Sequence, residues 1–370
     1  MRSLLTAAAI SLAFTLFLTP VFIRLFRQWG WGQVIRTPED IRNPSHAAKR
    51  GTPTMGGTIF IAGTIVGYLI GAYTGGNPPT VSALLVIWMM VGFGAVGFID
   101  DYMKVRRQRS LGLEGWPKVV GQILVTVPFG IAALNFPNQW DQTPASAYVS
   151  LFRDLPVLSF MALGPILGWL LYLAWLSLIG VASSNSVNVT DGLDGLAAGS
   201  GIFVVGAYSL IAFWQFNQVC TGVGPAPALL QACYDVRDPF DLAIISASFV
   251  GALVGFLWWN APKAQLFMGD AGSMAIGGVV AAMAILTRTE LLVILVAGVY
   301  VIASGSVILQ RLYFKLTRGK RMFLMSPLHH HLEMRGWSEV SIVVRMWIIA
   351  GMLAVSGVGL FYVEWLASAS

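Results

Sequence analysis

Long apolar segments recur along the whole chain and are separated by short polar ones. Ten of them approach or reach the roughly 20 residues that a helix needs to cross the hydrocarbon core of a bilayer. They cover residues 3–23, 54–73, 81–99, 119–136, 157–181, 195–216, 242–259, 271–287, 291–310 and 342–363. Open strand edges would leave polar backbone groups unpaired in lipid. The pattern therefore predicts an all-α polytopic membrane protein, with ten transmembrane helices in a single transmembrane domain covering residues 1–370.

Composition supports this interpretation and excludes other classes of protein. Hydrophobic residues make up 56% of the chain and charged residues 11%, whereas soluble domains carry roughly 25% charge. The chain cannot cover its own surface with polar groups, so lipid must be part of its solvent. The net charge of +6 therefore does not indicate a nucleic-acid partner, and we expect none. Residues 3–23 lack a small-residue cleavage site, so we interpret them as a retained first span rather than a signal peptide.

The basic residues predict the orientation. If the loops alternate between the two sides, 19 of the 23 Lys and Arg residues fall on one side and four on the other. The side with 19 contains the loops at residues 24–50, 100–118, 182–194, 260–270 and 311–345. Cytoplasmic loops carry the excess of Lys and Arg, so this side is predicted to be cytoplasmic and both termini to lie outside.

The residues that can support chemistry gather in the same five loops. Carboxylates occur at Asp100 and Asp101, which are followed by Lys104, and at Asp191, Asp194 and Asp270. Lys49, Asn188, Asn260 and the run His329-His330-His331 accompany them. No outer loop holds a comparable set. The distribution indicates an enzyme that works at the cytoplasmic surface of the membrane.

Structural explanations remain open for several of these residues. Asp270 precedes a predicted helix and is suited to capping it. Asp191 and Asp194 also precede a span, but with Asn188 they are spaced by three, which would place all three near one face if the stretch is helical. Two carboxylates at the C-terminal end of a helix, Asp100 and Asp101, oppose its macrodipole. For that pair we favour a functional explanation.

The remaining motifs narrow the chemistry. The glycine-rich stretch 51–57 lacks the Gly-Lys-Ser/Thr ending of a phosphate-binding loop, and a structural turn explains it equally well. The three consecutive histidines point in different directions and are a weak zinc motif, although imidazoles also serve as phosphate donors and acid–base groups. Carboxylates without a cysteine partner favour magnesium or manganese. The residues together indicate metal-assisted phosphoryl or phosphosugar transfer.

The motifs also resemble a known family. Lys49 to Gly57, Gly97 to Tyr102, Asn185 to Leu196, Asn260 to Gly272 and Pro327 to Trp337 occur in order over almost the whole chain. The chain resembles the polyprenyl-phosphate N-acetylhexosamine-1-phosphate transferases. The histidine run followed by Glu333 is similar to the branch whose donor carries a muramoyl pentapeptide.

This resemblance implies a reaction in peptidoglycan synthesis at the bacterial inner membrane. UDP-N-acetylmuramoyl-pentapeptide would give its phosphosugar to undecaprenyl phosphate, yielding lipid I and UMP, with Mg²⁺ required. It also suggests a homodimer surrounded by membrane lipid. One position departs from the family's pattern, because Ala303 stands where a glutamate is common.

The resemblance assigns site residues as well. It implies that Asp100, Asp101 and Asp270 are catalytic, that Asp100 accepts a proton from the lipid phosphate, and that Asp270 is a magnesium ligand. Phe267 would stack on uracil. The implied substrate-binding residues are Lys49, Asn188, Asp191, Asp194, Asn260, Phe267, Gln310, His329, His330 and His331.

Two rival functions and one covalent question stay open. Ten spans are also typical of a transporter, although transporters usually place polar sites near the midplane. A related transferase acting on UDP-N-acetylglucosamine is the alternative among enzymes. Cys220 and Cys233 fall in one predicted outer loop, where either a disulfide or two unpaired thiols would fit.

Overall fold

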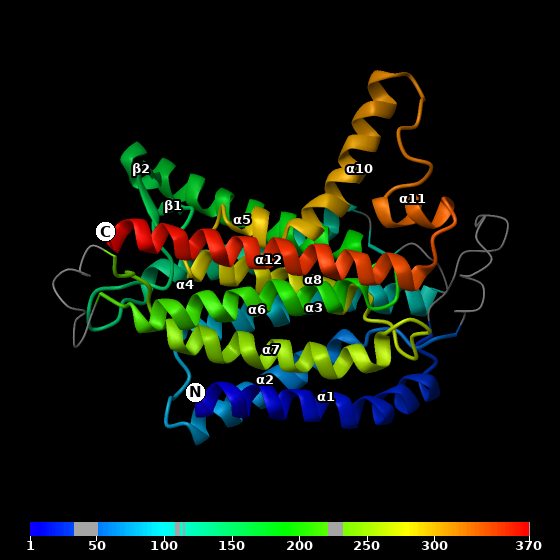
Figure 1. The fold of residues 1–370 in the computed structure, drawn as a ribbon, viewed down its shortest axis with the longest axis horizontal. Coiled ribbons are helices and arrows are strands. Elements are labelled where there is room, and N and C mark those ends of the chain that lie inside the picture. Colours follow the sequence, from blue (N-terminus) through cyan, green and yellow to red (C-terminus); the bar gives the residue numbers. More distant parts are fainter. Residues whose placement is uncertain (33–50, 108–111, 114, 221–231, 370) are drawn as a thin grey trace.

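The computed structural model describes residues 1–32, 51–107, 112–113, 115–220 and 232–369, and most of these are helical. Its elements are α1 (Arg2–Gln28), α2 (Gly57–Thr74), α3 (Val81–Arg107), α4 (Gly115–Asn135), β1 (Tyr148–Ser150), β2 (Asp154–Ser159), η3 (Phe160–Leu163), α5 (Pro165–Thr190), α6 (Leu196–Asn217), α7 (Pro239–Asn260), α8 (Gly269–Leu286), α9 (Val293–Val296), α10 (Gly298–Leu316), α11 (Leu328–Met334) and α12 (Glu339–Ala369). The long helices run roughly parallel or antiparallel in one bundle (Figure 1).

Within the described residues, nine helices are long and apolar enough to cross a membrane. They confirm a polytopic helical protein. The tenth expected span, residues 291–310, is divided into the single turn α9 and the longer α10, which leaves the bundle at a steep angle (Figure 1). The last turns of α10 carry Arg311 and Lys315, so its apolar stretch is too short to meet the pattern of the other nine.

Two boundaries differ from the sequence prediction. The span expected at 157–181 begins later, at Pro165, which takes the first position of α5 after Gly164 in a left-handed conformation. Residues before it form β2, which pairs antiparallel with β1, so the fold is not purely helical. At its other end α5 continues to Thr190. The expected loop at 182–194 is therefore largely helix.

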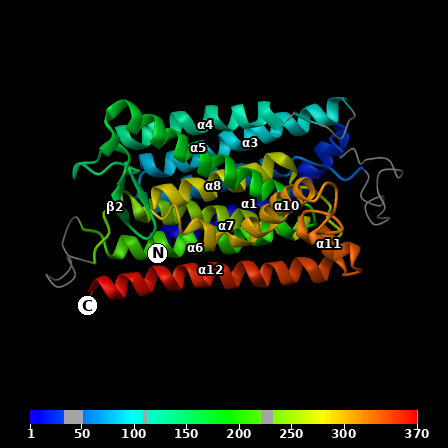
Figure 2. The ribbon, with the colours of Figure 1, turned by 90° about the horizontal axis from the view of Figure 1, so that it is seen from above.

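Helix α8 forms the centre of the bundle. Every residue from Ala271 to Leu286 is buried, and α8 contacts α2, α3, α5 and α6. In Figure 2, α4 and α12 lie on opposite flanks of the bundle. Glycine, alanine and serine dominate the sequence of α8, and small side chains let neighbouring backbones approach closely in lipid. The composition of this helix therefore explains its central position.

A stripe of small residues attaches α1 to the bundle. Ala7, Ser11, Thr15 and Thr19 recur every fourth position and are buried, while most of α1 is not. Glycines of α2 and α7 face this stripe; a Cβ added to Gly251 would lie 2.2 Å from the backbone oxygen of Ala8. Backbone contact through small residues holds most of the length of α1 in place, and the large side chains Ile23 and Phe26 are buried near its end.

Both termini lie at one end of the bundle (Figure 1), and we call this the terminal end. Cys220 and Cys233 form a disulfide there, which confirms the first of the two interpretations. Arg153 donates hydrogen bonds to the carbonyl oxygens of Ala232 and Cys233 and to Glu364 near the end of α12. One guanidinium thus ties the β-hairpin region, the disulfide and the last helix together.

Candidate active site

Three carboxylates meet at the end of the bundle opposite the termini, which we call the site end. Asp100 and Asp101 come from the last turns of α3, and Asp270 from the first turn of α8. Each residue offers one carboxylate oxygen, and these three oxygens lie within 4.8 Å of one another. Among the described residues this is a carboxylate group with metal-ligand spacing, and it contains the three residues that sequence analysis assigned to catalysis.

Glycines on both helices permit this meeting. Gly97 lies one turn before Asp101 on α3, and a Cβ there would lie 2.1 Å from the backbone oxygen of Asp270. Gly269 has a φ of +72°, and its Cβ would lie 2.3 Å from Oδ2 of Asp101. Any larger residue at either position would push α3 away from the start of α8. The glycines therefore set the separation of the carboxylates.

Two ammonium groups neutralise much of the negative charge. The Lys104 Nζ lies 2.5 Å from Asp100, 3.0 Å from Asp270 and 3.5 Å from Asp101. The Lys118 Nζ, from α4, lies 2.7 Å from Asp270 and 3.4 Å from Asp100. Three carboxylates this close would repel one another without such cations.

Sequence analysis assigned a role to neither lysine. The sequence spacing could have indicated that Lys104 contacts the carboxylates, because it lies four residues after Asp100 and three after Asp101, and such positions share a helix face. Lys118 has no such spacing, since only the packing of α4 against α3 brings it to the cluster.

The capping role considered for Asp270 belongs to Asp101 instead. Within the described residues, the hydrogen bonds of the Asp270 carboxylate run to other side chains and not to the backbone of α8. Its oxygens accept from Lys104, Lys118 and Asn188. Oδ2 of Asp101 accepts from the backbone N–H of Ala271, in the first turn of α8, at 3.1 Å. A carboxylate from α3 thus satisfies an amide at the positive end of another helix.

Asn188 belongs to this cluster, whereas Asp191 and Asp194 do not share its helix face. Asn188 lies in the last turns of α5 and donates to both Asp270 and Ser273. The helix ends at Thr190, so Asp191 and Asp194 lie in the turn that leads to α6. Removal from water, and then the charge of Asp270, raises the pKa of Asp191 to about 7. The predicted single helical face is therefore wrong beyond Asn188.

The turn after α5 is fixed by two other segments. The carboxylate of Asp194 accepts a hydrogen bond from the backbone N–H of Ala264, and the backbone N–H of Asp194 donates to the carboxylate of Glu339. Asn260 is buried and donates to the carbonyl oxygen of Leu266. These contacts join the turns before α6 and α8 with the start of α12.

The histidine run lies against the same turn. His329 and His330 stand on α11 with ring centroids 4.5 Å apart. A Cβ added to Gly192 would lie 2.3 Å from Nε2 of His329 and 3.0 Å from Nε2 of His330. Burial, and then the neighbouring His330, lower the pKa of His329 to about 3, so this imidazole is neutral. Neither of its ring nitrogens has a hydrogen-bond partner in the described part of the chain.

Three other predicted residues are placed differently. The backbone of Phe267 pairs with Pro53 and Gly56, so the glycine-rich stretch packs against the segment before α8. Gln310 bonds the backbone of Met322 and Phe323. His331 accepts from the backbone N–H of Leu324. Lys49 lies outside the described residues.

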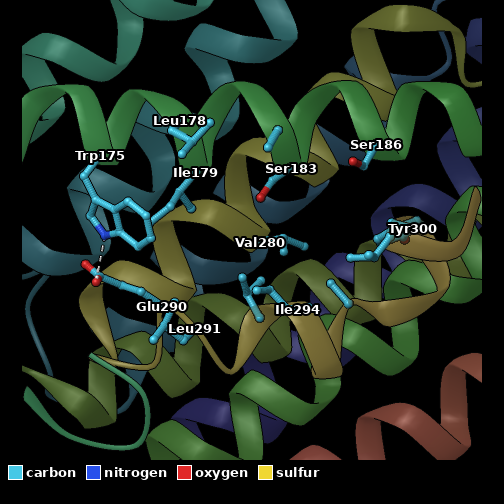
Figure 3. A pocket seen from close by; sticks show the side chains of 14 residues that line it. Trp175, Leu178, Ile179, Ser183, Ser186, Val280, Glu290, Leu291, Ile294 and Tyr300 are labelled. Atoms are coloured by element: carbon cyan, nitrogen blue, oxygen red, sulfur yellow. Dashed lines mark hydrogen bonds between the residues drawn. The ribbon is translucent and has the colours of Figure 1, made fainter. Parts of the chain in front are cut away.

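An apolar pocket runs along α5 between this helix and the α8–α10 region (Figure 3). Its volume is about 190 Å³, and it extends from Trp175 to Ser186 along α5. Asn188, which bonds Asp270, follows two residues after Ser186. Near the other end of the pocket, Glu290 accepts hydrogen bonds from Trp175 and from the backbone N–H of Ser150. The lining of this pocket suits an apolar group.

The chain is similar to known proteins over almost its whole length. Residues 83–288 match the model of glycosyl transferase family 4, and residues 49–61 match signature 1 of phospho-N-acetylmuramoyl-pentapeptide-transferases. A phospho-N-acetylmuramoyl-pentapeptide-transferase of Clavibacter michiganensis subsp. michiganensis is 56% identical over 99% of this chain and 100% of its own length. Enzymes of the same name from an Arthrobacter species and from Streptomyces griseus are 49% and 47% identical, each over 99% of both chains.

We predict that the cap supplied by Asp101 stabilises the fold separately from any chemistry. Asp101→Ala would leave the amide of Ala271 unpaired and should lower the free energy of unfolding by about 0.5–2 kcal/mol. Asp101→Asn keeps an acceptor oxygen and should stay close to wild type. Thermal unfolding of the three purified proteins measures this, and equal stability of the Ala and Asn variants would contradict the cap.

We also predict a pH effect from Glu290. Burial raises the pKa of its carboxyl from 4.5 to about 7, so the folded protein holds a proton that the unfolded chain releases. Stability should therefore fall as pH rises from 4.5 to about 7. Glu290→Gln keeps an acceptor oxygen for Trp175 and cannot ionise, so its melting temperature should exceed that of wild type increasingly across this range. A difference that does not change with pH would rule out this titration.

Proposed function

The chain belongs to the phospho-N-acetylmuramoyl-pentapeptide-transferase family, and from this premise we propose that it makes lipid I. It transfers phospho-N-acetylmuramoyl-pentapeptide from its UDP-linked precursor to undecaprenyl phosphate and releases UMP. The observation that carries the proposal is the cluster of Asp100, Asp101 and Asp270 with two lysines at one end of a membrane-spanning bundle. Two anionic substrates can react there at the boundary between water and lipid.

The cluster suits Mg²⁺ as the cofactor. Its donors are carboxylate oxygens from three residues, and hard oxygen donors without sulfur are the ligands that Mg²⁺ prefers. We assign Asp270 as the direct ligand, with Asp101 beside it. When bound, the cation would neutralise the diphosphate of the nucleotide substrate.

The lysines have a second use in this proposal. Lys104 and Lys118 are held by the carboxylates at 2.5–3.5 Å. Ammonium groups also bind phosphate oxygens. When the diphosphate enters, these groups can exchange carboxylate partners for phosphate oxygens and orient the bond that breaks. Lys49 is proposed to bind the substrate from the adjoining segment.

The nucleoside and the sugar are proposed to bind beside the cluster. Phe267 would stack on uracil. The other residues proposed to bind the donor substrate are Asn260, Asp191 and Asp194 in the turn after α5, and His329, His330 and His331 on α11. Gln310 is proposed to support substrate binding indirectly, by holding in place the segment with Met322 and Phe323. Asn188, which donates to Asp270 at 2.9 Å, orients that carboxylate.

The acceptor is proposed to enter from lipid. Part of its isoprenoid chain would lie in the apolar pocket along α5, and its phosphate would then lie near Asn188 and the cluster. Asp100 would take the proton from this phosphate and free the oxygen that attacks the diphosphate. The site end would face the cytoplasm, with both termini outside, because α1 and α3 end there with Arg27, Lys104, Arg106 and Arg107 and cytoplasmic segments carry the excess of basic residues. The membrane would be the bacterial inner membrane, and the protein would form a homodimer.

Release of UMP by the purified protein tests this function. With both substrates and Mg²⁺ we expect UMP and a lipid-linked product, and chelation of the metal should abolish both. Replacing the donor with UDP-N-acetylglucosamine should give no product. Product from that donor alone would identify the related aminosugar transferase instead, and no product from either donor would refute transferase activity.

We predict that Asp270→Asn lowers turnover by about a thousandfold or more, on the order of 4 kcal/mol of barrier, without loss of the fold. Asn retains the shape of the side chain but removes the charge that binds both lysines and the cation. Asp141→Asn, in an exposed loop, is the matched control and should keep normal turnover. Near-normal turnover of the Asp270 variant would remove this residue from the chemistry.

We predict that Asp100 and Asp101 differ in their pH and metal dependence. The second pKa of a phosphate monoester is about 6, so the acceptor ionises without help at higher pH. The rate lost in Asp100→Asn should therefore shrink as pH rises. Asp101→Asn should instead raise the Mg²⁺ concentration required for half-maximal rate. If Asp100→Asn is equally slow at every pH, a base is the wrong role for Asp100.

A further inference from the structure

A cationic surface at the far end of α10 is unrelated to the carboxylate cluster. We call it the α10 tip and define it by its five cations, Arg311, Lys315, Arg318, Lys320 and Arg321, all of which are exposed. Figure 1 shows α10 leaving the bundle sideways and the following segment returning to α11 at the site end. The tip therefore projects beyond the flank of the bundle rather than along it.

Exposed apolar side chains alternate with these cations. Leu312, Phe314 and Leu316 are 53%, 46% and 74% exposed, and Met322, Leu324 and Met325 about half exposed. A surface facing water alone would not keep so many apolar groups uncovered. A helix that lies in the interface of a membrane has this composition, with apolar groups in the acyl region and Lys and Arg reaching the headgroups.

The cations of the tip are not used within the described protein. No Asp or Glu occurs between Glu290 and Glu333 in the sequence. None of the five cations has an ion pair with a carboxylate of the described residues. Their charge is therefore available for an external anion.

Hydrogen bonds fix the conformation of the α10 tip. Oε1 of Gln310 accepts the backbone N–H groups of Met322 and Phe323 at 3.1 and 2.9 Å. His331 accepts from Leu324, and Ser306 accepts from the backbone N–H of Leu328. The returning segment is thus tied to α10 on one side and to the histidine helix on the other.

We propose that the α10 tip is a docking surface for the headgroups of anionic phospholipids at the site-end face of the membrane. The unpaired cations meet the phosphates, and the apolar side chains between them enter the acyl region. A soluble polyanion would match the charge but would leave the apolar groups uncovered. Because Leu324 bonds His331, lipid bound at the tip also holds the position of α11.

Native mass spectrometry of the full chain in a neutral detergent tests this proposal, with dioleoyl phosphatidylglycerol, dioleoyl phosphatidylcholine and undecaprenyl phosphate as probes. The test variant is Arg318→Gln/Lys320→Gln/Arg321→Gln. The control, Arg27→Gln/Lys263→Gln/Arg335→Gln, removes the same charge from exposed cations of three other segments at the site end. Melting temperatures near wild type confirm that both variants are folded.

We expect wild type and control to bind phosphatidylglycerol at least tenfold more tightly than phosphatidylcholine. The tip variant should lose at least tenfold of this preference, since each Lys or Arg near a charged surface contributes roughly fivefold in affinity. An unchanged preference in the tip variant would overturn the proposal. So would a tip variant that loses polyprenyl phosphate but retains phosphatidylglycerol, because the tip would then recognise the acceptor. These results do not depend on whether the protein transfers a phosphosugar.

Discussion

The backbone contact between α3 and α8 is the constraint on which the site depends. Gly97 and Gly269 allow the two helices to touch where their ends carry Asp100, Asp101 and Asp270. Like charges at this distance are stable only with compensation, which Lys104, Lys118 and the amide of Ala271 supply. The contact between α3 and α8 therefore requires close packing and charge compensation at the same place. A change in either would separate the carboxylates.

Lipid as a solvent explains where the polar groups are found. Charged residues of the nine spanning helices occur toward the helix ends, as Arg345 and Glu364 do in α12. A site near the midplane, as expected for a transporter, is not evident among the described spans. Helix association instead uses small residues, and the central α8 is an example. The bundle positions polar side chains at both of its ends, with the carboxylate cluster at the site end and the Arg153 contacts at the terminal end.

The interruption between α9 and α10 produces two surfaces of different composition. Toward the bundle, the α5 side bounds an apolar pocket that leads toward Asn188. Away from it, α10 carries exposed cations and exposed apolar groups. Ser306 and His331 connect both surfaces to α11. One irregular segment thus adjoins both the apolar pocket and the histidine helix α11.

Sequence alone determined the class of protein and the identity of the carboxylates. Apolar segments of membrane length can fold only as helices in lipid. In the described part of the chain, nine helices are long and apolar enough to span a membrane, while the tenth span and the orientation stay predictions. Charge placed against a helix dipole identified Asp100 and Asp101. Tertiary structure decided the partners. Lys118 reaches Asp270 through packing of α4, and Asp101 caps a helix to which it does not belong. Such contacts join residues more than 150 positions apart, and local patterns carry no information about them.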